Sequence, residues 1–375
     1  MLTSTERTVT PRVASKDLTA PWHHIDAVLA GAVGLTLAIG VVLVYGATRH
    51  TEDNSGLVYR HAGFVLVGVL AGVLVATVDY RRILSWWPAL YTVSIAALAG
   101  VLTPLGATVN GTSGWYRLGP VSLQPAELAK LTTIISVAAF LGAADRVDWR
   151  RLAVAVGLLV APVGLVLLQP DLGSALVFAA IALGMLLVGG VRLRDLLILA
   201  VLAIAAVALV LGSGRLDEYQ QERLSNFLST DGQSYNVTQA QTSISSGGLT
   251  GYGFGKGPQT RGGFVPVQES DFIFTVVGEE FGFLGSALLV GLLGVIVWRI
   301  WRVAQLAADP AGTLLCAGVL SMFLFHIFEN IGMTLGIMPV TGIPLPFVSY
   351  GGTSIVASCV AVGLVESVHM RRFSR

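Results

Sequence analysis

The sequence predicts a polytopic all-α membrane protein with about ten transmembrane helices and a large extracytoplasmic loop between spans 7 and 8. Hydrophobic residues make up 54% of the 375 residues and charged residues only 12%, about half the charged share of a typical soluble domain. Mean hydropathy is +0.75, so too little polar surface remains to cover one soluble core. The apolar residues also stand in long blocks, such as 196–211, which carries no charge.

Each long apolar block is interpreted as one membrane-spanning helix. A helix needs roughly 20 mostly apolar residues to cross the hydrocarbon layer, and backbone groups in lipid must be hydrogen-bonded within the segment, which favours helices over strands. The predicted spans are 25–46, 60–78, 85–104, 122–143, 152–169, 171–189, 195–212, 271–298, 311–338 and 349–369. The link at 169–172 is the weakest division, because one broken helix would give the same pattern.

The placement of Lys and Arg predicts that both termini are cytoplasmic, because every short connection on the side of the N-terminus is basic. A multi-pass protein of the cytoplasmic membrane is therefore expected. No signal peptide precedes the first apolar block, which is expected to remain as an uncleaved span. The predicted segments are a cytoplasmic tail (1–24), spans 1–7 (25–212), the extracytoplasmic loop (213–270), spans 8–10 (271–369) and a second cytoplasmic tail (370–375).

Several classes of site and partner are disfavoured by composition. The two cysteines, Cys316 and Cys359, lie inside apolar spans, where packing explains them better than a disulfide or a metal site. The net charge of +1 argues against a nucleic-acid partner.

The large loop is rich in Gly, Gln, Ser and Thr but keeps several aromatic residues, which argues against disorder throughout. We expect it to fold against the outer surface, with amphipathic helices near 218–227 and 237–245. Its glycine run, 247–257, has no preceding strand and following helix of the kind that nucleotide-binding loops require, so a turn is favoured over a phosphate site.

Polar residues at the predicted outer ends of the spans are the main functional candidates, because ionisable groups in membranes are costly. The first group is Trp115 and Arg117, followed by Glu127 and Lys130. Glu127 and Lys130 are three residues apart, so they share a helix face and can pair. They form either a self-neutralising structural pair or a site at which Lys130 or Arg117 supports an anionic group.

The second and third groups each contain an aspartate at the predicted outer end of a span, where that helix begins. Asp171 suits the N-cap of the sixth span, and Asp271, beside Ser270, suits the N-cap of the eighth. Glu279 and Glu280 lie about two turns inside that span. We expect them to pair with Arg or Lys from another helix, because adjacent carboxylates there need partners.

The fourth group is the uncharged turn 339–354, which is dense in Pro and Gly and follows a helix carrying His326, Glu329 and Asn330. It either shapes a groove or offers backbone donors to a polar ligand. All four groups lie toward one predicted face, and structural pairs alone would not need to gather there.

At these residues the sequence resembles the SEDS family (shape, elongation, division and sporulation), along essentially all ten spans. QPAELAK, QPDLG, SDFIFTVVGEEFGFLG and TGIPLPFVSYGGTS occur in this order, and the combination is far more specific than any one piece. The resemblance implies a peptidoglycan glycosyltransferase that polymerises lipid II. The motif GEEFGFLG and the short segment after the last span favour the RodA branch, which serves cell elongation and shape, over the FtsW branch, which serves division.

The resemblance also implies roles for individual residues. The essential aspartate of the family matches Asp271. The positions matched as substrate-binding are Trp115, Arg117, Glu127, Lys130, Asp171, Gln220, Ser349, Gly351 and Gly352. Gln220 stands in a YQxxR-like stretch of the loop. Members often carry Pro-Glu-x-x-Thr-Asp-Phe before the eighth span, whereas this chain has Val267 in place of the Glu, so a role for that carboxylate is in doubt.

The chemistry of such a reaction assigns further roles. A sugar hydroxyl must lose a proton as it attacks, which calls for a general base, and Asp271 is best placed. The departing lipid diphosphate needs positive charge from Arg117, Lys130 or a divalent cation such as Mg²⁺ or Mn²⁺, although the sequence shows no ligand cluster. The implied partners are lipid II, the growing glycan strand, membrane lipid and a class B penicillin-binding protein. No Ser-x-x-Lys transpeptidase motif occurs in this chain, which agrees with a separate transpeptidase partner.

Two other classes remain open from the sequence. A flippase or transporter for lipid-linked precursors would bind substrate near the midplane at broken helices of a repeated fold, whereas the ionisable residues gather at the outer boundary here. A non-catalytic scaffold for a transpeptidase is disfavoured by the nearly intact motif set.

Overall fold

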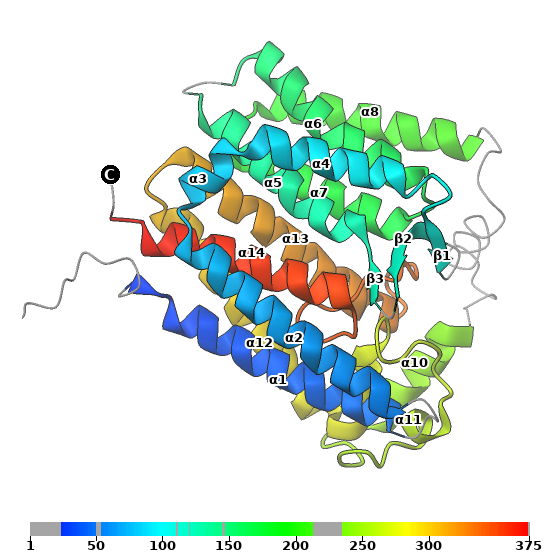
Figure 1. Cartoon of the computed structure of the whole chain (residues 1–375). Coiled ribbons are helices and arrows are strands. Elements are labelled where there is room, and N and C mark those ends of the chain that lie inside the picture. The colour runs from blue at the N-terminus through cyan, green and yellow to red at the C-terminus, as the bar shows by residue number, and fades with distance from the viewer. Residues whose placement is uncertain are drawn as a thin grey trace, which may run out of the picture.

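The computed structural model describes residues 24–49, 54–109, 112–119, 121–144, 147–212 and 235–373. Within these ranges, ten long apolar helices lie side by side in one bundle (Figure 1) and correspond one to one to the predicted spans. In chain order they are α1 (Ala27–Thr48), α2 (Asn54–Thr77), α4 (Trp87–Gly100), α5 (Pro125–Gly142), α6 (Trp149–Leu167), α7 (Leu172–Val188), α8 (Leu193–Gly212), α12 (Ile273–Leu306), α13 (Pro310–Thr334) and α14 (Gly352–Met370).

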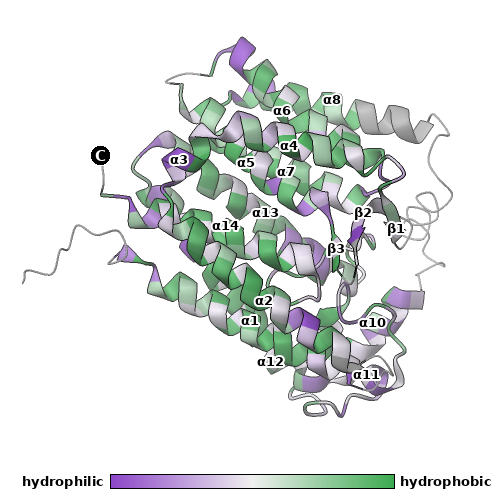
Figure 2. Cartoon of the chain, viewed as in Figure 1, coloured by the Kyte–Doolittle hydropathy of each residue, from purple (hydrophilic) through white to green (hydrophobic). Residues whose placement is uncertain are grey.

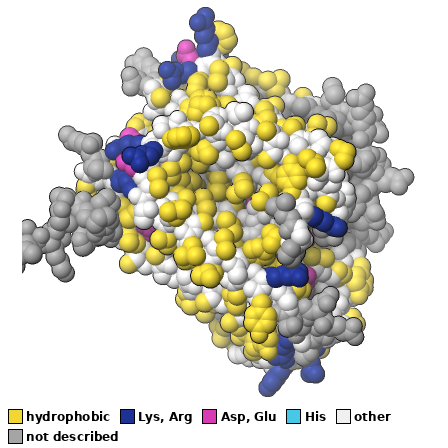
Figure 3. All heavy atoms as spheres, in the orientation of Figure 1, with side chains coloured by type: hydrophobic (Ala, Val, Ile, Leu, Met, Phe, Trp, Pro, Cys, Tyr) yellow, Lys and Arg dark blue, Asp and Glu magenta, His cyan; other side chains and the backbone are white. Residues whose placement is uncertain are grey.

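By length and composition, seven helices in the described part of the chain qualify as membrane spans: α1, α2, α5, α6, α12, α13 and α14. Two shorter apolar helices, α4 and α7, lie beside them. Apolar residues cover the helices along their length (Figure 2), and hydrophobic side chains cover the middle of the visible face while Lys and Arg stand toward its edges (Figure 3). This distribution fits a bundle whose outer surface faces hydrocarbon.

The centre of the bundle is built from α5, α13 and α14. Their apolar windows are 72%, 56% and 78% buried, against 17% for α2 and 22% for α6. Helix α13 packs against α5, α7, α12 and α14, so it is enclosed on most sides. Small residues allow the tightest approaches. At Gly72 of α2, an added Cβ would lie 2.6 Å from the carbonyl oxygen of Cys359 on α14.

The start of α1 and the end of α14 lie at one end of the bundle, and a small sheet with the loop helices lies at the other (Figure 1). The sheet is antiparallel in the order β1 (Ala107–Val109), β2 (Thr112–Leu118), β3 (Val121–Leu123). We call this end the sheet end. The predicted fourth span began at 122, which is wrong, because β3 occupies that position and α5 begins only at Pro125.

Two predicted features of the connections are confirmed. Helices α6 and α7 are separate, since α6 ends at Leu167 and α7 begins at Leu172. The loop helix α10 (Tyr235–Ser246) covers the segment 237–245, and a short helix, α11 (Pro258–Gly262), follows it. The helix predicted at 218–227 lies outside the described residues. On the other end of the bundle, the short helix α3 (Tyr80–Ser85) connects α2 to α4.

Helix α12 is broken near its start, which the sequence did not predict. Gly282 has φ 64° and ψ −158°, a conformation open to glycine and costly for other residues. The loop fills the break with backbone hydrogen bonds: Tyr252 N donates to Glu279 O at 3.1 Å, and Phe283 N donates to Gly248 O at 2.9 Å. The predicted glycine-rich turn is therefore packed against α12, and it replaces the helical hydrogen bonds lost at the break.

Candidate active site

The main chain at Asp271 is held by a hydrogen-bonded clamp from α13. The side-chain amide of Asn330 donates to the main-chain carbonyl of Asp271 at 2.8 Å and to that of Ile343 at 2.8 Å. Asn330 is fully buried, with 0% exposure. The clamp therefore joins the residue before α12 to the irregular loop 335–351 between α13 and α14.

A second set of hydrogen bonds fastens the same two segments. Ser349 Oγ donates to the carbonyl oxygen of Ser270 and accepts from Leu345 N at 2.8 Å. Tyr350 N donates to Glu269 O at 2.8 Å. Ser349, a predicted substrate-binding residue, therefore positions the segment that carries Asp271.

Asp271 does not cap α12, so that prediction is wrong. The helix begins at Ile273, and the N-cap position is Phe272, without a side-chain cap. Asp271 Oδ1 accepts a hydrogen bond from the Ser270 hydroxyl at 2.8 Å. The carboxyl group is half-buried, beside Gly342, where an added Cβ would lie 3.3 Å from Asp271 Oδ2. The Asp271 carboxylate is therefore held at the junction of the loop and α12 and does not serve as a helix cap.

Asp171 caps α7 as predicted and is tied to α5. Its Oδ1 accepts from Ser174 N at 2.8 Å, and its Oδ2 accepts from Ser174 Oγ at 2.8 Å and Gln124 Nε2 at 3.1 Å. Gln124 in turn donates its backbone N–H to Thr353 Oγ1 at 3.1 Å. The starts of α5, α7 and α14 therefore meet at the sheet end, in a polar network that includes the turn before α14.

The turn before α14 also contains Gly351 and Gly352. Gly351 is the N-cap of α14, and an added Cβ at Gly352 would lie 2.7 Å from the ring of Phe64 on α2. Gly352 therefore allows α14 to begin close against α2, which is a packing role for one of the predicted binding residues.

Glu127 and Lys130 form the predicted pair, and the structure adds a histidine to it. Lys130 Nζ lies 2.7 Å from Glu127 Oε1 and 3.1 Å from His326 Nε2 of α13. Since the ammonium is a donor, His326 Nε2 is the acceptor in this contact. The side chains of Lys130 and Glu127 are 1% and 5% exposed. The ammonium therefore reaches a substrate only after this buried cluster opens or exchanges a partner.

Trp115 and Arg117 lie on β2, where Trp115 is half-buried. The alternate residue Tyr116 points to the bundle and donates its hydroxyl to Ala97 O at 2.8 Å. Arg117 is exposed and stands opposite Ser122 in the sheet. Among the described residues, no hydrogen bond or ion pair joins Arg117 to Lys130 or Asp171. Gln220 lies outside the described residues.

Glu329 and Thr341 extend the wall beside Asp271. Thr341 Oγ1 donates to Glu329 Oε1 at 2.8 Å, and an added Cβ at Gly173 of α7 would lie 2.9 Å from Thr341 O. The QPDLG and DFIF motifs are thus connected through the loop that follows α13. The sequence marked His326, Glu329 and Asn330 as candidates because they are polar residues inside an apolar helix. It did not predict which residues they would contact.

Glu279 is stabilised by neutral donors, so the predicted pairing with Arg or Lys is wrong for it. It accepts hydrogen bonds from Gln259 N at 2.6 Å, Thr260 N at 2.9 Å, Thr260 Oγ1 at 2.6 Å and Ser243 Oγ at 3.3 Å. In the described part of the chain it forms no ion pair. Glu280 lies within electrostatic reach of Arg49, which directly follows the last residue of α1.

No group of three or more His, Cys, Asp or Glu gathers into a potential metal site within the described residues. Divalent cations such as Mg²⁺ bind through several oxygen ligands. The described residues at the sheet end do not form such a set.

Comparison with known proteins extends over nearly the whole chain. Residues 26–373 match the family model for the FtsW, RodA and SpoVE cell cycle proteins. Stage V sporulation protein E of Bacillus subtilis is 33% identical over 91% of this chain and 95% of its own length. The peptidoglycan glycosyltransferase MrdB of Escherichia coli is 31% identical over 93% and 94%, and the probable peptidoglycan glycosyltransferase FtsW of Trichlorobacter lovleyi is 32% identical over 92% and 92%.

Solved structures match over the same length. The Rod shape determining protein RodA of Thermus thermophilus superposes with a TM-score of 0.73 at 31% identity, covering 94% of this chain and 99% of that one. A chain of a peptidoglycan synthase complex, solved to explain the coordination of polymerization and crosslinking, superposes with a TM-score of 0.81 at 31% identity, covering 94% and 100%. The chain therefore belongs to the FtsW, RodA and SpoVE family of cell cycle proteins, the SEDS family.

Proposed function

We propose that this peptidoglycan glycosyltransferase polymerises lipid II into glycan strands at the outer face of the cytoplasmic membrane, with Asp271 as the general base. The observation that carries the proposal is the half-buried Asp271 carboxylate, held between two segments that Asn330 and Ser349 fasten together. Related proteins are named peptidoglycan glycosyltransferases, which supports the reaction class. The placement of Lys and Arg supports the orientation, with the sheet end outside.

The geometry around Asp271 suits proton abstraction. A sugar hydroxyl that attacks an anomeric carbon must transfer its proton to a positioned base. Asp271 stands on a main chain whose carbonyl is fixed by a buried amide, and such fixed surroundings keep a reacting group near its productive position. The adjacent Ser270 hydroxyl donates to Asp271 Oδ1 at 2.8 Å, which helps to fix the orientation of the carboxylate.

Two cations can support the departing lipid diphosphate, and they differ in access. Arg117 is exposed on β2, so it can meet the diphosphate as the substrate arrives. Lys130 is buried with Glu127 and His326, so its charge acts on the site through the fixed cluster or after a partner exchange. Positive charge placed at the leaving group stabilises the transition state most when water is excluded.

Cell elongation, as for RodA, is our proposed setting, with a class B penicillin-binding protein as partner. A neighbour in the structural comparison is a chain of a peptidoglycan synthase complex that polymerises and crosslinks, which supports a transpeptidase partner. Replacing the endogenous RodA or FtsW in a depletion strain separates the branches. Rescue of cell width supports elongation, and rescue of septation alone would assign the chain to division.

The decisive experiment compares purified wild-type protein with Asp271→Asn in polymerisation of fluorescent lipid II, with and without partner protein and divalent cation. Asp271→Asn should stay folded and make no polymer. Glu269→Gln is the matched control. Glu269 takes part through its main-chain carbonyl, which accepts from Tyr350 N, so the change of its side chain should leave the protein active. Near-normal polymer from folded Asp271→Asn would remove the catalytic assignment. Translocation of labelled lipid II in liposomes without polymer would favour a flippase.

A further inference from the structure

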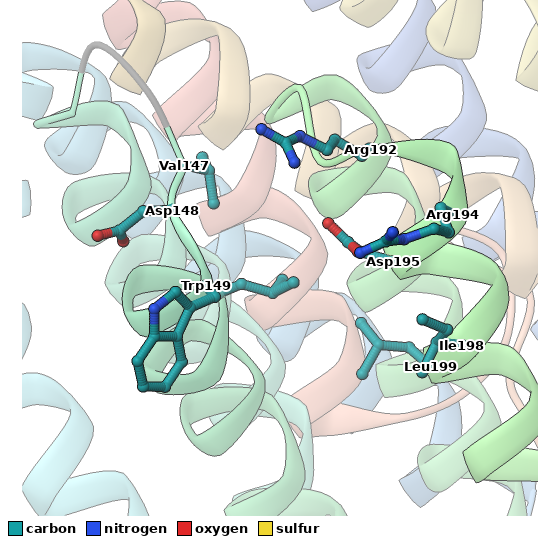
Figure 4. A pocket seen from close by; sticks show the side chains of 9 residues that line it. Val147, Asp148, Trp149, Arg192, Arg194, Asp195, Ile198 and Leu199 are labelled. Atoms are coloured by element: carbon teal, nitrogen blue, oxygen red, sulfur yellow. The ribbon is translucent and has the colours of Figure 1, made fainter.

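A pocket lies at the end of the bundle opposite the sheet end, between the starts of α6 and α8 (Figure 4). Its volume is about 480 Å³. Figure 4 shows Asp148 and Trp149 on one side, and Arg192, Arg194 and Asp195 on the other. None of these residues belongs to the candidate active site.

The helix packing explains why this opening exists. Helices α6 and α8 each pack against α7, whereas α6 and α8 make little or no contact with each other in the described part of the chain. The two helices therefore flank α7 and leave a gap between them. Both carry exposed apolar side chains, including Ile198 at 49% exposure and Leu197 at 58%. The exposed apolar side chains beside this gap are suited to contact with acyl chains.

The lining changes from cationic to apolar within a short distance. Arg192 immediately precedes α8 and Arg194 lies in its first turn, whereas Leu152, Ile198 and Leu199 supply the apolar wall. Arg192 forms no ion pair with another described residue, and the Arg194 side chain is 81% exposed, with its Nε 3.6 Å from Asp195 Oδ1. That separation exceeds a hydrogen-bond distance, so both guanidinium groups keep donors for an anion.

Two carboxylates also line the pocket, Asp148 and Asp195, and Asp195 offsets part of the positive charge at Arg194. Asp148 caps α6 by accepting from Arg151 N at 2.9 Å, and its side chain points away from Arg192 in Figure 4. Trp149 is 73% exposed beside the pocket, and the Arg150 guanidinium lies 5.4 Å from its ring centre. Exposed Trp and Arg at the end of a span are typical of the level of lipid headgroups.

We propose that this pocket binds one anionic glycerophospholipid, with its phosphate between Arg192 and Arg194 and an acyl chain along Leu152, Ile198 and Leu199. A guanidinium is suited to phosphate because its planar donors match two phosphate oxygens. The leaflet rests on the proposed orientation, which places this end of the bundle at the cytoplasmic surface. The site itself is independent of the glycosyltransferase reaction.

The test is lipid retention by the full chain, measured by native mass spectrometry after exchange into detergent with equimolar dioleoyl phosphatidylglycerol and dioleoyl phosphatidylethanolamine. Wild-type protein should retain one phosphatidylglycerol about tenfold in preference to phosphatidylethanolamine, a ratio that corresponds to about 1.4 kcal/mol. Two arginines near a headgroup favour anionic lipid by about 1 kcal/mol each, and the Asp195 carboxylate beside Arg194 offsets part of this. Arg192→Gln/Arg194→Gln should lose that preference. Arg302→Gln is the matched control, because Arg302 is exposed on α12 and bonds to Gln305, and it should bind as wild type.

Two further arms identify the ligand. Leu152→Trp should fill the apolar wall and weaken retention of the lipid with both arginines present. Inorganic phosphate should compete poorly, because it lacks the acyl chain. Unchanged selectivity in the double-arginine variant, equal retention of the two lipids, or displacement by millimolar phosphate would each overturn the proposal. The assay contains no lipid II, so its failure is distinguishable from failure of the proposed reaction.

Discussion

Asn330 holds the main chain of Asp271 through a 2.8 Å hydrogen bond that crosses 59 positions of sequence. The other amide hydrogen of the same residue goes to Ile343 at 2.8 Å. One buried side chain therefore sets the position of the catalytic candidate relative to the loop before α14. A buried amide that satisfies two carbonyls is costly to remove, because both acceptors lose their partner.

Asn330→Asp should keep the shape of the side chain but lose both donated hydrogen bonds. We expect polymerisation to fall by about tenfold or more while KM for lipid II changes little, because a displaced base slows the chemical step. Thr334→Ala is the control, since Thr334 Oγ1 bonds to Ile331 O of its own helix. Steady-state kinetics with fluorescent lipid II measure both constants. An unchanged kcat in the folded variant would show that the clamp does not position the base.

The buried pair of Glu127 and Lys130 has two possible roles, and a double variant separates them. Lys130→Met alone should destabilise the protein by about 3–5 kcal/mol, because it leaves a buried carboxylate without its partner. Glu127→Gln/Lys130→Met should recover much of the melting temperature, since neither buried charge remains. We expect polymerisation to stay lost in the double variant. Activity that returns together with stability would assign the pair to structure alone.

Glu279 fastens the loop over the break in α12, and its removal should loosen that segment. Glu279→Ala leaves the N–H groups of Gln259 and Thr260 and the Thr260 hydroxyl without their acceptor. An unsatisfied buried donor costs about 1–3 kcal/mol, so hydrogen exchange at Gln259 and Thr260 should accelerate. Thr242→Ala, whose hydroxyl bonds to Thr238 O within α10, should leave exchange unchanged. Protection equal to wild type would contradict the fastening role.

Asp309, at the end of the bundle opposite the sheet end, makes a pH-dependent contribution to the free energy of unfolding. Burial raises the pKa of Asp309, but hydrogen bonds from Tyr80, Gly312 N and Arg81 outweigh burial and hold the pKa below its usual value. A depressed carboxyl pKa stabilises the folded state above the unfolded pKa, and this contribution is lost as pH falls through the folded value. Asp309 lies between α12 and α13, outside the spans.

Asp309→Asn should therefore lower the melting temperature at pH 7, by the equivalent of about 1 kcal/mol for a partly exposed group. The difference from wild type should shrink as pH falls from about 4 to 3 and below, where the wild-type carboxylate is protonated. Thermal unfolding in detergent across this range measures it. A difference that is constant with pH would mean that the loss comes from packing rather than charge.

The ten helices and the end at which the polar motifs gather were predictable from the sequence, because hydropathy acts locally. Twenty apolar residues in a row require a helix in lipid whatever their neighbours are. The pairing of Glu127 with Lys130 and the capping by Asp171 were predictable for the same reason, since each needs partners within one turn of a helix.

Asp271, Glu279 and Lys130 show what the sequence could not predict. The start of α12 after Phe272, the neutral donors of Glu279 and the contact of His326 with Lys130 depend on segments far apart in the chain. The sheet formed by β1, β2 and β3 and the break at Gly282 are also set by such contacts. Sequence alone determined the spans, the family and the candidate residues. Only the tertiary structure decided which side chains hold Asp271 in place, because hydrogen bonds between distant segments exist only once the helices have packed.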